Sequence, residues 1–248
     1  MRILSQHPDV EIEIITSEPD HVGKKISDIH PYLQGIADFK LFSTDEVKKR
    51  NIDVAFLALP HGISMQFVKN YGLNKFRVID LSGDFRITEK EYNKWYQNHH
   101  ICPDYIDEAV YGLPELFYKD IKDAKLLANP GCYPTSCILP LAPLLKAKLL
   151  DISCIIIDSK SGVSGAGVKA KESTHFPLVN ENFSAYGIFS HRHTPEINQV
   201  LSYKSKSTIN VIFTPHVIPL NRGILTTIYV KPNQRMNRNK VYEILRSY

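Results

Sequence analysis

Short apolar segments alternate with helical or polar segments along the first half of the chain. Four of them are predicted strands, at residues 11–16, 53–59, 77–81 and 125–129. The second and third are almost continuously apolar, which is typical of strands covered on both faces in a parallel sheet. Ser43 and Thr88 each stand three residues before a glutamate, the spacing of a helix capping box. This alternation predicts an α/β fold with a parallel sheet.

The pattern changes after residue 129. A proline-interrupted apolar segment, 132–150, precedes a strand at 154–158, a glycine-rich turn and a polar stretch rich in histidine and asparagine. Two strand-like runs follow, INVIFTPH and ILTTIYV; the segment that joins them predicts either antiparallel neighbours or a longer loop excursion. The last residues, NRNKVYEILRSY, predict a helix. We place a domain boundary near residue 131, dividing the chain into 1–131 and 132–248.

Composition excludes several classes of partner. The 248 residues include 30 Lys+Arg and 26 Asp+Glu, a formal charge of +4. They show no basic stripe of the kind that binds a row of phosphates, so no nucleic-acid partner is expected. No apolar run approaches the ~20 residues of a membrane helix, and no membrane association is expected. Four cysteines without a CxxC pair predict reduced thiols, and with no secretory signal in view we expect a cytoplasmic protein.

The segment NPGCYPTS places Cys132 directly after a strand and a Pro-Gly turn, at the start of a predicted helix. Backbone N–H groups and the helix dipole at such a position stabilise a thiolate. Cys132 is therefore a candidate nucleophile; the alternative is a small buried cysteine that only packs. A nucleophilic cysteine needs an acid or base nearby.

Candidates for that base are His191 and His193 in the segment HRHTPEI, with His175 and His216 elsewhere. The alternative for His191 and His193 is a solvated polar loop. The H-x-H pair is also compatible with a metal, but no third ligand stands at a recognised spacing, and we expect no metal site.

Two further turns are candidate anion sites. The segment SGVSGAG (161–167) follows a strand, so its backbone N–H groups are candidates to cradle an anion, and a flexible turn is the alternative. Arg86, in LSGDFR, ends another strand and suits a carboxylate or phosphate. A surface ion pair is the alternative interpretation for Arg86.

A doubly wound nucleotide-binding domain opens with a strand, a glycine-rich turn and a helix. Here residues 1–7 look like the end of a helix, and the expected first strand and GxGxxG turn are missing. This pattern predicts that the chain is incomplete or lacks a dinucleotide site.

Six motifs in order resemble the N-acetyl-γ-glutamyl-phosphate reductase family: LALPHG (57–62), LSGDFR (81–86), YGLPELF (111–117), NPGCYPTS (129–136), SGVSGAG (161–167) and HRHTPEI (191–197). The resemblance covers essentially the whole chain. It implies a Rossmann-like nucleotide-binding domain followed by a mixed α/β catalytic domain of the semialdehyde dehydrogenase and glyceraldehyde-phosphate dehydrogenase type. The family's opening strand and its closing segment, which returns to the first domain, are both expected to be missing here.

The resemblance also implies the chemistry. Cys132 would attack the acyl phosphate of N-acetyl-glutamyl 5-phosphate, expel phosphate and hold a thioester, which NADPH reduces to the semialdehyde in arginine biosynthesis. His191 matches the family's acid/base histidine, with His193 as the alternative and His216 a poorer third. The residues expected to bind substrate are Arg86, Asn129, Ser161, Arg192 and His193.

The cofactor would contact the LALPHG turn and the SGVSGAG loop. The expected residues are Thr16, Ser17, Pro60, His61, Gly162, Ser164 and Gly165. The resemblance implies a preference for NADP over NAD. The residues themselves do not, because Glu18 is an unhelpful anion beside a 2′-phosphate, although Lys24 and Lys25 could compensate.

Several alternatives stay open. A non-catalytic remnant would bind substrate or a partner subunit without turnover, and a cysteine hydrolase would release phosphate without reduction. A carrier-bound α-aminoadipyl phosphate is an alternative substrate. The resemblance also leads us to expect a homo-oligomer acting on a small-molecule acyl phosphate.

Overall fold

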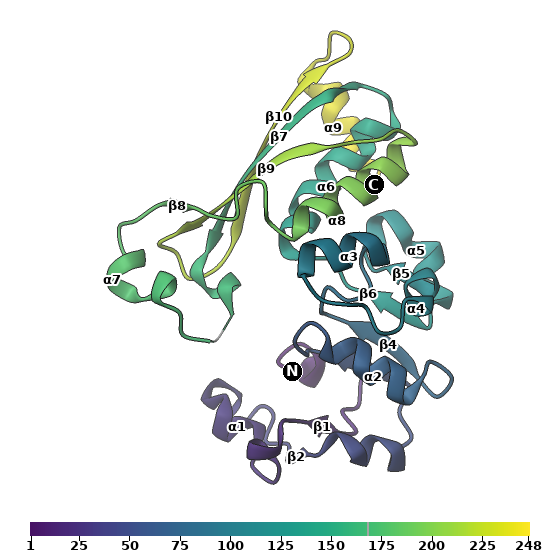
Figure 1. The fold of residues 1–248 in the computed structure, drawn as a ribbon, viewed down its shortest axis with the longest axis vertical. Coiled ribbons are helices and arrows are strands. Elements are labelled where there is room, and N and C mark those ends of the chain that lie inside the picture. Colours follow the sequence, from purple (N-terminus) through teal and green to yellow (C-terminus); the bar gives the residue numbers. More distant parts are fainter. Residues whose placement is uncertain (168) are drawn as a thin grey trace. The chain divides into compact units, whose positions relative to one another are not determined.

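The computed structural model describes residues 1–167 and 169–248, and its contacts divide the chain into two units, Met1–Val54 and Ala55–Tyr248 (Figure 1). The domain boundary expected near residue 131 stays a prediction. None of the helices within the described residues is long and apolar enough to cross a membrane.

The first unit contains a two-stranded parallel sheet. Strand β1 (Ile15–Thr16) pairs with β2 (Leu41–Phe42). Beside them, Ile26 in helix α1 (Ile26–Ile29) packs with Leu33 and Leu41 in a small apolar cluster. The strand expected at 11–16 is shorter than predicted, because only its last two residues pair with another strand. Four 3-10 helices complete the unit: Leu4–Gln6, Pro19–His21, Pro31–Leu33 and Thr44–Lys49.

A four-stranded sheet follows, with the order β3-β4-β6-β5. Its strands are β3 (Val54–Leu57), β4 (Arg77–Asp80), β5 (Ala109–Tyr111) and β6 (Leu126–Ala128). The predicted parallel pairing is confirmed for β6, which runs parallel to both β4 and β5. The helices of this region are α2 (Ile63–Tyr71), α3 (Glu89–Tyr96), α4 (Asp104–Glu108) and α5 (Pro114–Asp123).

One of the two predicted capping residues caps its helix. The Thr88 hydroxyl accepts a hydrogen bond from the Glu91 N–H at the start of α3, which satisfies a donor that the helix itself leaves unpaired. Ser43 stands before a 3-10 helix and makes no such side-chain bond.

The second sheet has the order β10-β7-β9-β8. Its strands are β7 (Leu150–Gly162), β8 (Ser184–Ala185), β9 (Val211–Ile218) and β10 (Ile224–Pro232). Strand β9 runs parallel to β7 and β10 runs antiparallel to it, one on each side. The expectation that β9 and β10 are antiparallel neighbours is therefore wrong. Their connection instead makes the longer excursion past β7, which was the alternative.

Two helices cover one face of this sheet, α6 (Cys132–Lys146) and α8 (His193–Ser205) (Figure 1). Alternate residues of β7 point towards them: Ile155 and Ile157 are fully buried, whereas Ile156 between them is exposed. Helix α6 contributes Ile138 and Leu141 to the same core. Tyr133, next to Cys132, belongs to the same core and so anchors the start of α6. Helices α7 (Phe176–Val179) and α9 (Arg238–Arg246) complete the fold, the latter over the terminal segment predicted to be helical.

Candidate active site

Cys132 is the first residue of α6. Strand β6 ends at Ala128, and the turn to the helix is tied to β4 by a hydrogen bond from the Asn129 N–H to the Asp80 carbonyl, 2.9 Å. The Asn129 side chain donates to the Pro130 carbonyl. Cys132 is exposed and unpaired, as a nucleophile must be, and is not the buried packing residue of the alternative interpretation.

Opposing effects act on the pKa of the Cys132 thiol. Surrounding protein atoms raise its pKa, whereas the N–H groups of Tyr133 and Cys132 itself and the charge of Arg86 lower it. The net direction is upward. The N–H groups at the helix start thus favour the thiolate as expected, but burial outweighs them, which agrees with the expectation that the thiol needs a base nearby.

Two imidazoles lie beside this helix start. The His193 ring lies against Gly131: a Cβ added to that glycine would be 2.5 Å from Nε2. The His191 and His193 rings are in edge contact, with centroids 4.9 Å apart, and His191 also contacts the Tyr133 ring at 5.5 Å. The structure therefore brings both predicted histidines to the residues that flank Cys132.

Both imidazoles are neutral at physiological pH. Burial lowers the pKa of His193 to about 3, with contributions from the charges of Arg86 and Arg192. Burial also lowers the pKa of His191 to about 3, helped by His193 and Arg192. The His193 backbone N–H donates to His191 Nδ1, 3.2 Å, so the ring proton of His191 is on Nε2. His193 Nδ1 is buried and has no hydrogen-bond partner among the described residues. A neutral imidazole has a free ring nitrogen that accepts a hydrogen bond from a thiol, but at a pKa of about 3 it takes the proton only when a bound anion, such as a phosphate group, raises that pKa.

A buried carboxylate, Glu196, joins the elements around the cysteine. Its Oε1 accepts hydrogen bonds from the Gly131 N–H, 2.8 Å, and from the Tyr111 hydroxyl, 2.7 Å. Its Oε2 pairs with Arg86 Nη1 at 3.5 Å. Glu196 lies within the HRHTPEI motif but is not among the site residues predicted from the sequence. The sequence feature that could have identified Glu196 is that it is the one acidic residue in HRHTPEI, a segment that otherwise supplies an arginine and two histidines.

Arg86 is buried, with a side chain 6 % exposed. It pairs with Glu196 and donates to the Leu81 carbonyl, and within the described part of the chain its Nε has no hydrogen-bond partner. The surface ion pair considered as the alternative is therefore excluded. Gln199 accepts from the Thr88 N–H and donates to the Arg86 carbonyl, which ties α8 to this turn. Arg86 thus lies in the same buried network as the start of α6.

The LALPHG and LSGDFR turns are linked to each other. The Asp84 carboxylate accepts from the N–H groups of Gly62 and Met65 and so caps α2. His61 Nδ1 accepts from the Gly83 N–H, 2.9 Å, and burial lowers the pKa of His61 to about 4. Pro60 and His61 are exposed after the carboxyl end of β3, where ligands of α/β sheets bind.

The SGVSGAG loop reaches the site at one end. Ser161 is buried and lies within hydrogen-bonding reach of Tyr133, the residue after the cysteine. The expected cradle of free N–H groups is wrong for the start of the loop: the N–H groups of Gly162, Val163 and Ser164 donate to carbonyls of the turn at 220–223. Gly162 packs so closely on that turn that an added Cβ would be 2.8 Å from a backbone nitrogen.

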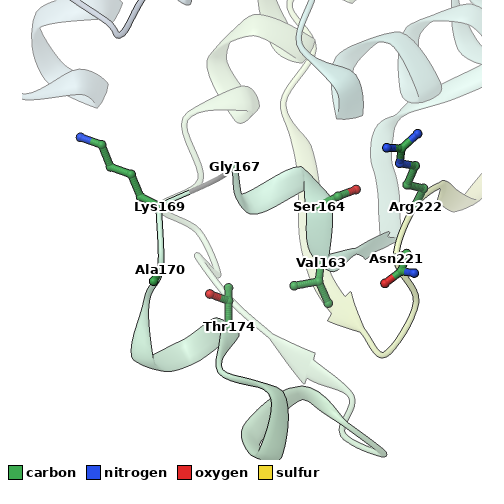
Figure 2. Close-up of a pocket in the computed structure, with 8 residues that line it drawn as sticks. All are labelled: Val163, Ser164, Gly167, Lys169, Ala170, Thr174, Asn221 and Arg222. Atoms are coloured by element: carbon green, nitrogen blue, oxygen red, sulfur yellow. The ribbon is translucent and has the colours of Figure 1, made fainter. Parts of the chain in front are cut away.

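A pocket of about 430 Å³ lies beside this loop (Figure 2). It includes Ser164, with Lys169 and Arg222 as its charged residues. In Figure 2 these two side chains extend in different directions rather than towards a common point. Because neither Cys132 nor the histidines line it, the candidate chemistry lies outside this pocket.

Among the remaining predicted residues, His216 lies near the start of α6, because its carbonyl accepts a hydrogen bond from the Tyr133 hydroxyl, 3.3 Å. Thr16 ends β1 in the first unit, and the Ser17 N–H donates to the Phe42 carbonyl. The His216 imidazole lies 3.1 Å from an Asp158 carboxylate oxygen. His175 lies before α7. Among the residues that the structure describes, no group of three or more His, Cys, Asp or Glu side chains is arranged to hold a metal ion.

The chain is similar to known proteins over its whole length. It matches the family model "Semialdehyde dehydrogenase, NAD binding domain" over residues 1–124 and "Semialdehyde dehydrogenase, dimerisation domain" over residues 132–248. The N-acetyl-gamma-glutamyl-phosphate reductase of Rhodopirellula baltica is 48 % identical over 233 residues, which cover 93 % of this chain and 67 % of that protein. The protein of the same name from Caldicellulosiruptor saccharolyticus is 48 % identical over 252 residues, or 100 % and 72 % of the two chains.

Solved structures show the same fold at low identity. Aspartate semialdehyde dehydrogenase II of Vibrio cholerae, complexed with ASA, aligns with a TM-score of 0.69 and 14 % identity over 98 % of this chain and 73 % of that one. The aspartate semialdehyde dehydrogenase of Candida albicans with NADP aligns with a TM-score of 0.63 and 15 % identity over 100 % and 72 %. The predicted fold class is confirmed, and the chain belongs to the N-acetyl-gamma-glutamyl-phosphate reductase family.

Proposed function

We propose that this protein catalyses the NADPH-dependent reductive dephosphorylation of N-acetyl-glutamyl 5-phosphate to N-acetyl-glutamate 5-semialdehyde in arginine biosynthesis. The observation that carries the proposal is the exposed Cys132 at the start of α6 with two neutral imidazoles beside it. The names of the relatives favour this catalytic interpretation over binding without turnover.

The chain's own groups account for the covalent step. The Cys132 thiol gives its proton to an imidazole while its sulfur forms a bond to the acyl carbon. The carbon–oxygen bond to the phosphate breaks, and phosphate leaves with the electron pair. The nicotinamide supplies, when bound, the hydride that the thioester carbon accepts. The carbon–sulfur bond then breaks, releasing the semialdehyde and the Cys132 thiolate.

The contacts distinguish the two histidines. His191 is the acid/base expected from the resemblance, but its ring is packed among Tyr133, Tyr186 and Phe213. The His193 ring lies against Gly131, the residue that precedes the cysteine. We therefore favour His193 for proton transfer with Cys132, and we assign His191 to fixing its position. Replacing each by asparagine tests this: His193→Asn is expected to lower kcat more than His191→Asn.

The match to an NAD binding domain supports a nicotinamide cofactor. Pro60 and His61, exposed beyond β3, fit one side of such a group, and Gly62 adopts a φ of +87° that shapes this turn. We propose NADP rather than NAD, with Thr16 and Ser17 near the 2′-phosphate. Gly162, Ser164 and Gly165 would contact the nicotinamide through side-chain or carbonyl groups. Comparing kcat/KM for the two cofactors tests the preference.

Oligomerisation is supported by the match to a dimerisation domain. The sheet face opposite α6 carries a row of exposed apolar side chains, because Ile156 pairs with Ile212 on one side and with Tyr229 on the other. We propose that a second copy of the chain packs on this face. Ile156→Lys is expected to give monomers in sedimentation, whereas Tyr118→Lys, on an exposed residue of α5, is not. Unchanged mass in Ile156→Lys would exclude this face.

The activity is tested in the reverse direction with N-acetyl-glutamate semialdehyde, phosphate and NADP⁺, following NADPH formation. Cys132→Ser should abolish the reaction, and Cys154→Ser, at the other exposed cysteine, should not. In the forward direction, phosphate release without cofactor at the full rate would indicate a hydrolase instead. A carrier-bound α-aminoadipyl phosphate tested in parallel decides between the two substrates. A cytoplasmic location stays a prediction.

A further inference from the structure

Tyr96, the last residue of α3, lies where three of the motif segments meet. Its ring stacks on Tyr92, with centroids 4.6 Å apart and planes at 10°. It meets the His61 ring edge-on at 4.9 Å. The Arg192 guanidinium carbon lies 5.2 Å from the centroid of the Tyr96 ring. One aromatic side chain that belongs to none of the motifs therefore contacts both the LALPHG turn and the HRH segment.

The ring of Tyr96 is held against a third segment, LSGDFR. A Cβ at Gly83 would be 2.6 Å from Tyr96 Cζ, so only glycine leaves room for the ring. Burial raises the pKa of the Tyr96 hydroxyl to about 12, so this group is neutral at physiological pH. The stack on Tyr92 and the close approach of Gly83 leave the ring little freedom. Tyr96 is thus a rigid aromatic surface.

Arg192 differs from Arg86 in having no carboxylate partner within the part of the chain that the structure describes. Arg192 is exposed, whereas Arg86 is paired with Glu196. The carboxylates nearest this region are already engaged: Glu196 with Arg86 and Gly131, and Asp84 with the start of α2. The charge of Arg192 is therefore available to an anion from outside the chain.

Two positive groups, Arg192 and Arg86, act on the same place. The charges of Arg192 and Arg86 lower the pKa of His193 and contribute to lowering that of His61. The electrostatic fields of the two arginines thus overlap at the His61 and His193 rings. His193 lies beside the turn that carries Cys132. A concentration of positive charge next to a nucleophile attracts an anionic substrate group.

We infer that Tyr96 is a positioning residue, whose ring holds the Arg192 guanidinium in place to bind an anionic group of the substrate. The inference rests on the proposed function and assigns part of its substrate site. An arginine stacked on an aromatic ring loses less freedom when it binds an anion than a free one does. The anionic group is either the phosphoryl group or a carboxylate of the acyl phosphate.

The reverse reaction separates these two sources, because phosphate and the semialdehyde are distinct substrates. We expect Tyr96→Leu to raise the KM of one of them about 3- to 10-fold, with kcat changed less. Tyr96→Phe keeps the ring and should restore the KM towards the wild-type value. Arg192→Met should raise the KM of the same substrate, and the double variant should raise it no further. Trp95→Leu, on the neighbouring residue of α3, is the matched control.

Binding gives a readout that does not depend on turnover. Inorganic phosphate and N-acetyl-glutamate are titrated calorimetrically into the cofactor-free protein and into each variant. Weaker binding of one anion to Tyr96→Leu, with normal binding recovered in Tyr96→Phe, supports the inference. This holds even if the wild-type protein shows no turnover, because a lack of turnover would contradict only the proposed function. The inference is overturned if neither anion binds more weakly to Tyr96→Leu, if Tyr96→Phe and Tyr96→Leu behave alike, or if the effects of Tyr96→Leu and Arg192→Met add.

Discussion

The His193 imidazole lies directly on Gly131, leaving no room for a side chain at the residue that precedes the candidate nucleophile. An added Cβ would stand 2.5–2.9 Å from three atoms of the ring. The glycine has an ordinary φ of −65°, so space and not backbone conformation requires it. The relationship couples the start of α6 to the start of α8.

Gly131→Ala should therefore displace the imidazole. We expect kcat to fall at least about 10-fold, as misplacement of a catalytic group by about 1 Å costs more than that in other enzymes. Gly112→Ala is the matched control, because its added Cβ would make only ordinary contacts of 3.4 Å or more. A Gly131→Ala enzyme with unchanged kcat would show that the His193 ring has no part in the slow step.

Removing the Glu196 carboxylate should destabilise the fold. Glu196→Ala leaves the Arg86 charge buried without its partner and the Gly131 N–H without an acceptor, so we expect a loss of about 3–5 kcal/mol in the free energy of unfolding. Adding Arg86→Met should recover a large part of the loss. Urea denaturation measures both changes, and a loss under about 1 kcal/mol in Glu196→Ala would mean that the network contributes little.

Acid should destabilise the folded chain through the two histidines. Their pKa values in the folded chain, about 3, lie below the value of about 6.5 expected when unfolded, so the unfolded chain binds more protons between these values. The free energy of unfolding should fall as the pH is lowered from 6.5, by at most about 1.4 kcal/mol per pH unit for each group. His193→Asn should reduce this slope, whereas His99→Asn, at an exposed histidine, should not. Equal slopes in the wild type and His193→Asn would contradict the buried, neutral imidazole.

Local patterns predicted the parallel sheet around β6 and the start of α6 well. The reason is that an apolar run, a Pro-Gly turn and a helix start act over a few residues, as at Ala128 to Cys132. The pairing of β9 and β10 with β7 was not predicted, because strand order depends on how the chain crosses the sheet. The free N–H groups expected at the start of the SGVSGAG loop were wrongly predicted for a similar reason: the carbonyls that accept from Gly162, Val163 and Ser164 lie 57 to 61 residues further along the chain, in the turn at 220–223.

The candidate site was predicted in part. Cys132, His191, His193 and Arg86 come together as expected from the motifs. The parts that escaped prediction are those defined by tertiary contacts, namely the buried Glu196 and the aromatic surface of Tyr96. From the sequence alone, a glutamate in a helix is taken as a surface residue and a tyrosine as a packing residue. Only the tertiary contacts, Tyr111 with Glu196 and Arg192 with Tyr96, show that these two side chains belong to the site.

The central claim, covalent catalysis by Cys132, is tested most directly by trapping the acyl-enzyme. The protein is mixed with N-acetyl-glutamyl 5-phosphate without cofactor, quenched in acid and digested, and the peptide around residue 132 is analysed by mass spectrometry. We predict an N-acetyl-glutamyl group on Cys132, about one phosphate released per chain, and loss of the adduct when NADPH is added before the quench. An unmodified Cys132 in protein that turns over substrate, or an adduct on a different residue, would contradict the mechanism.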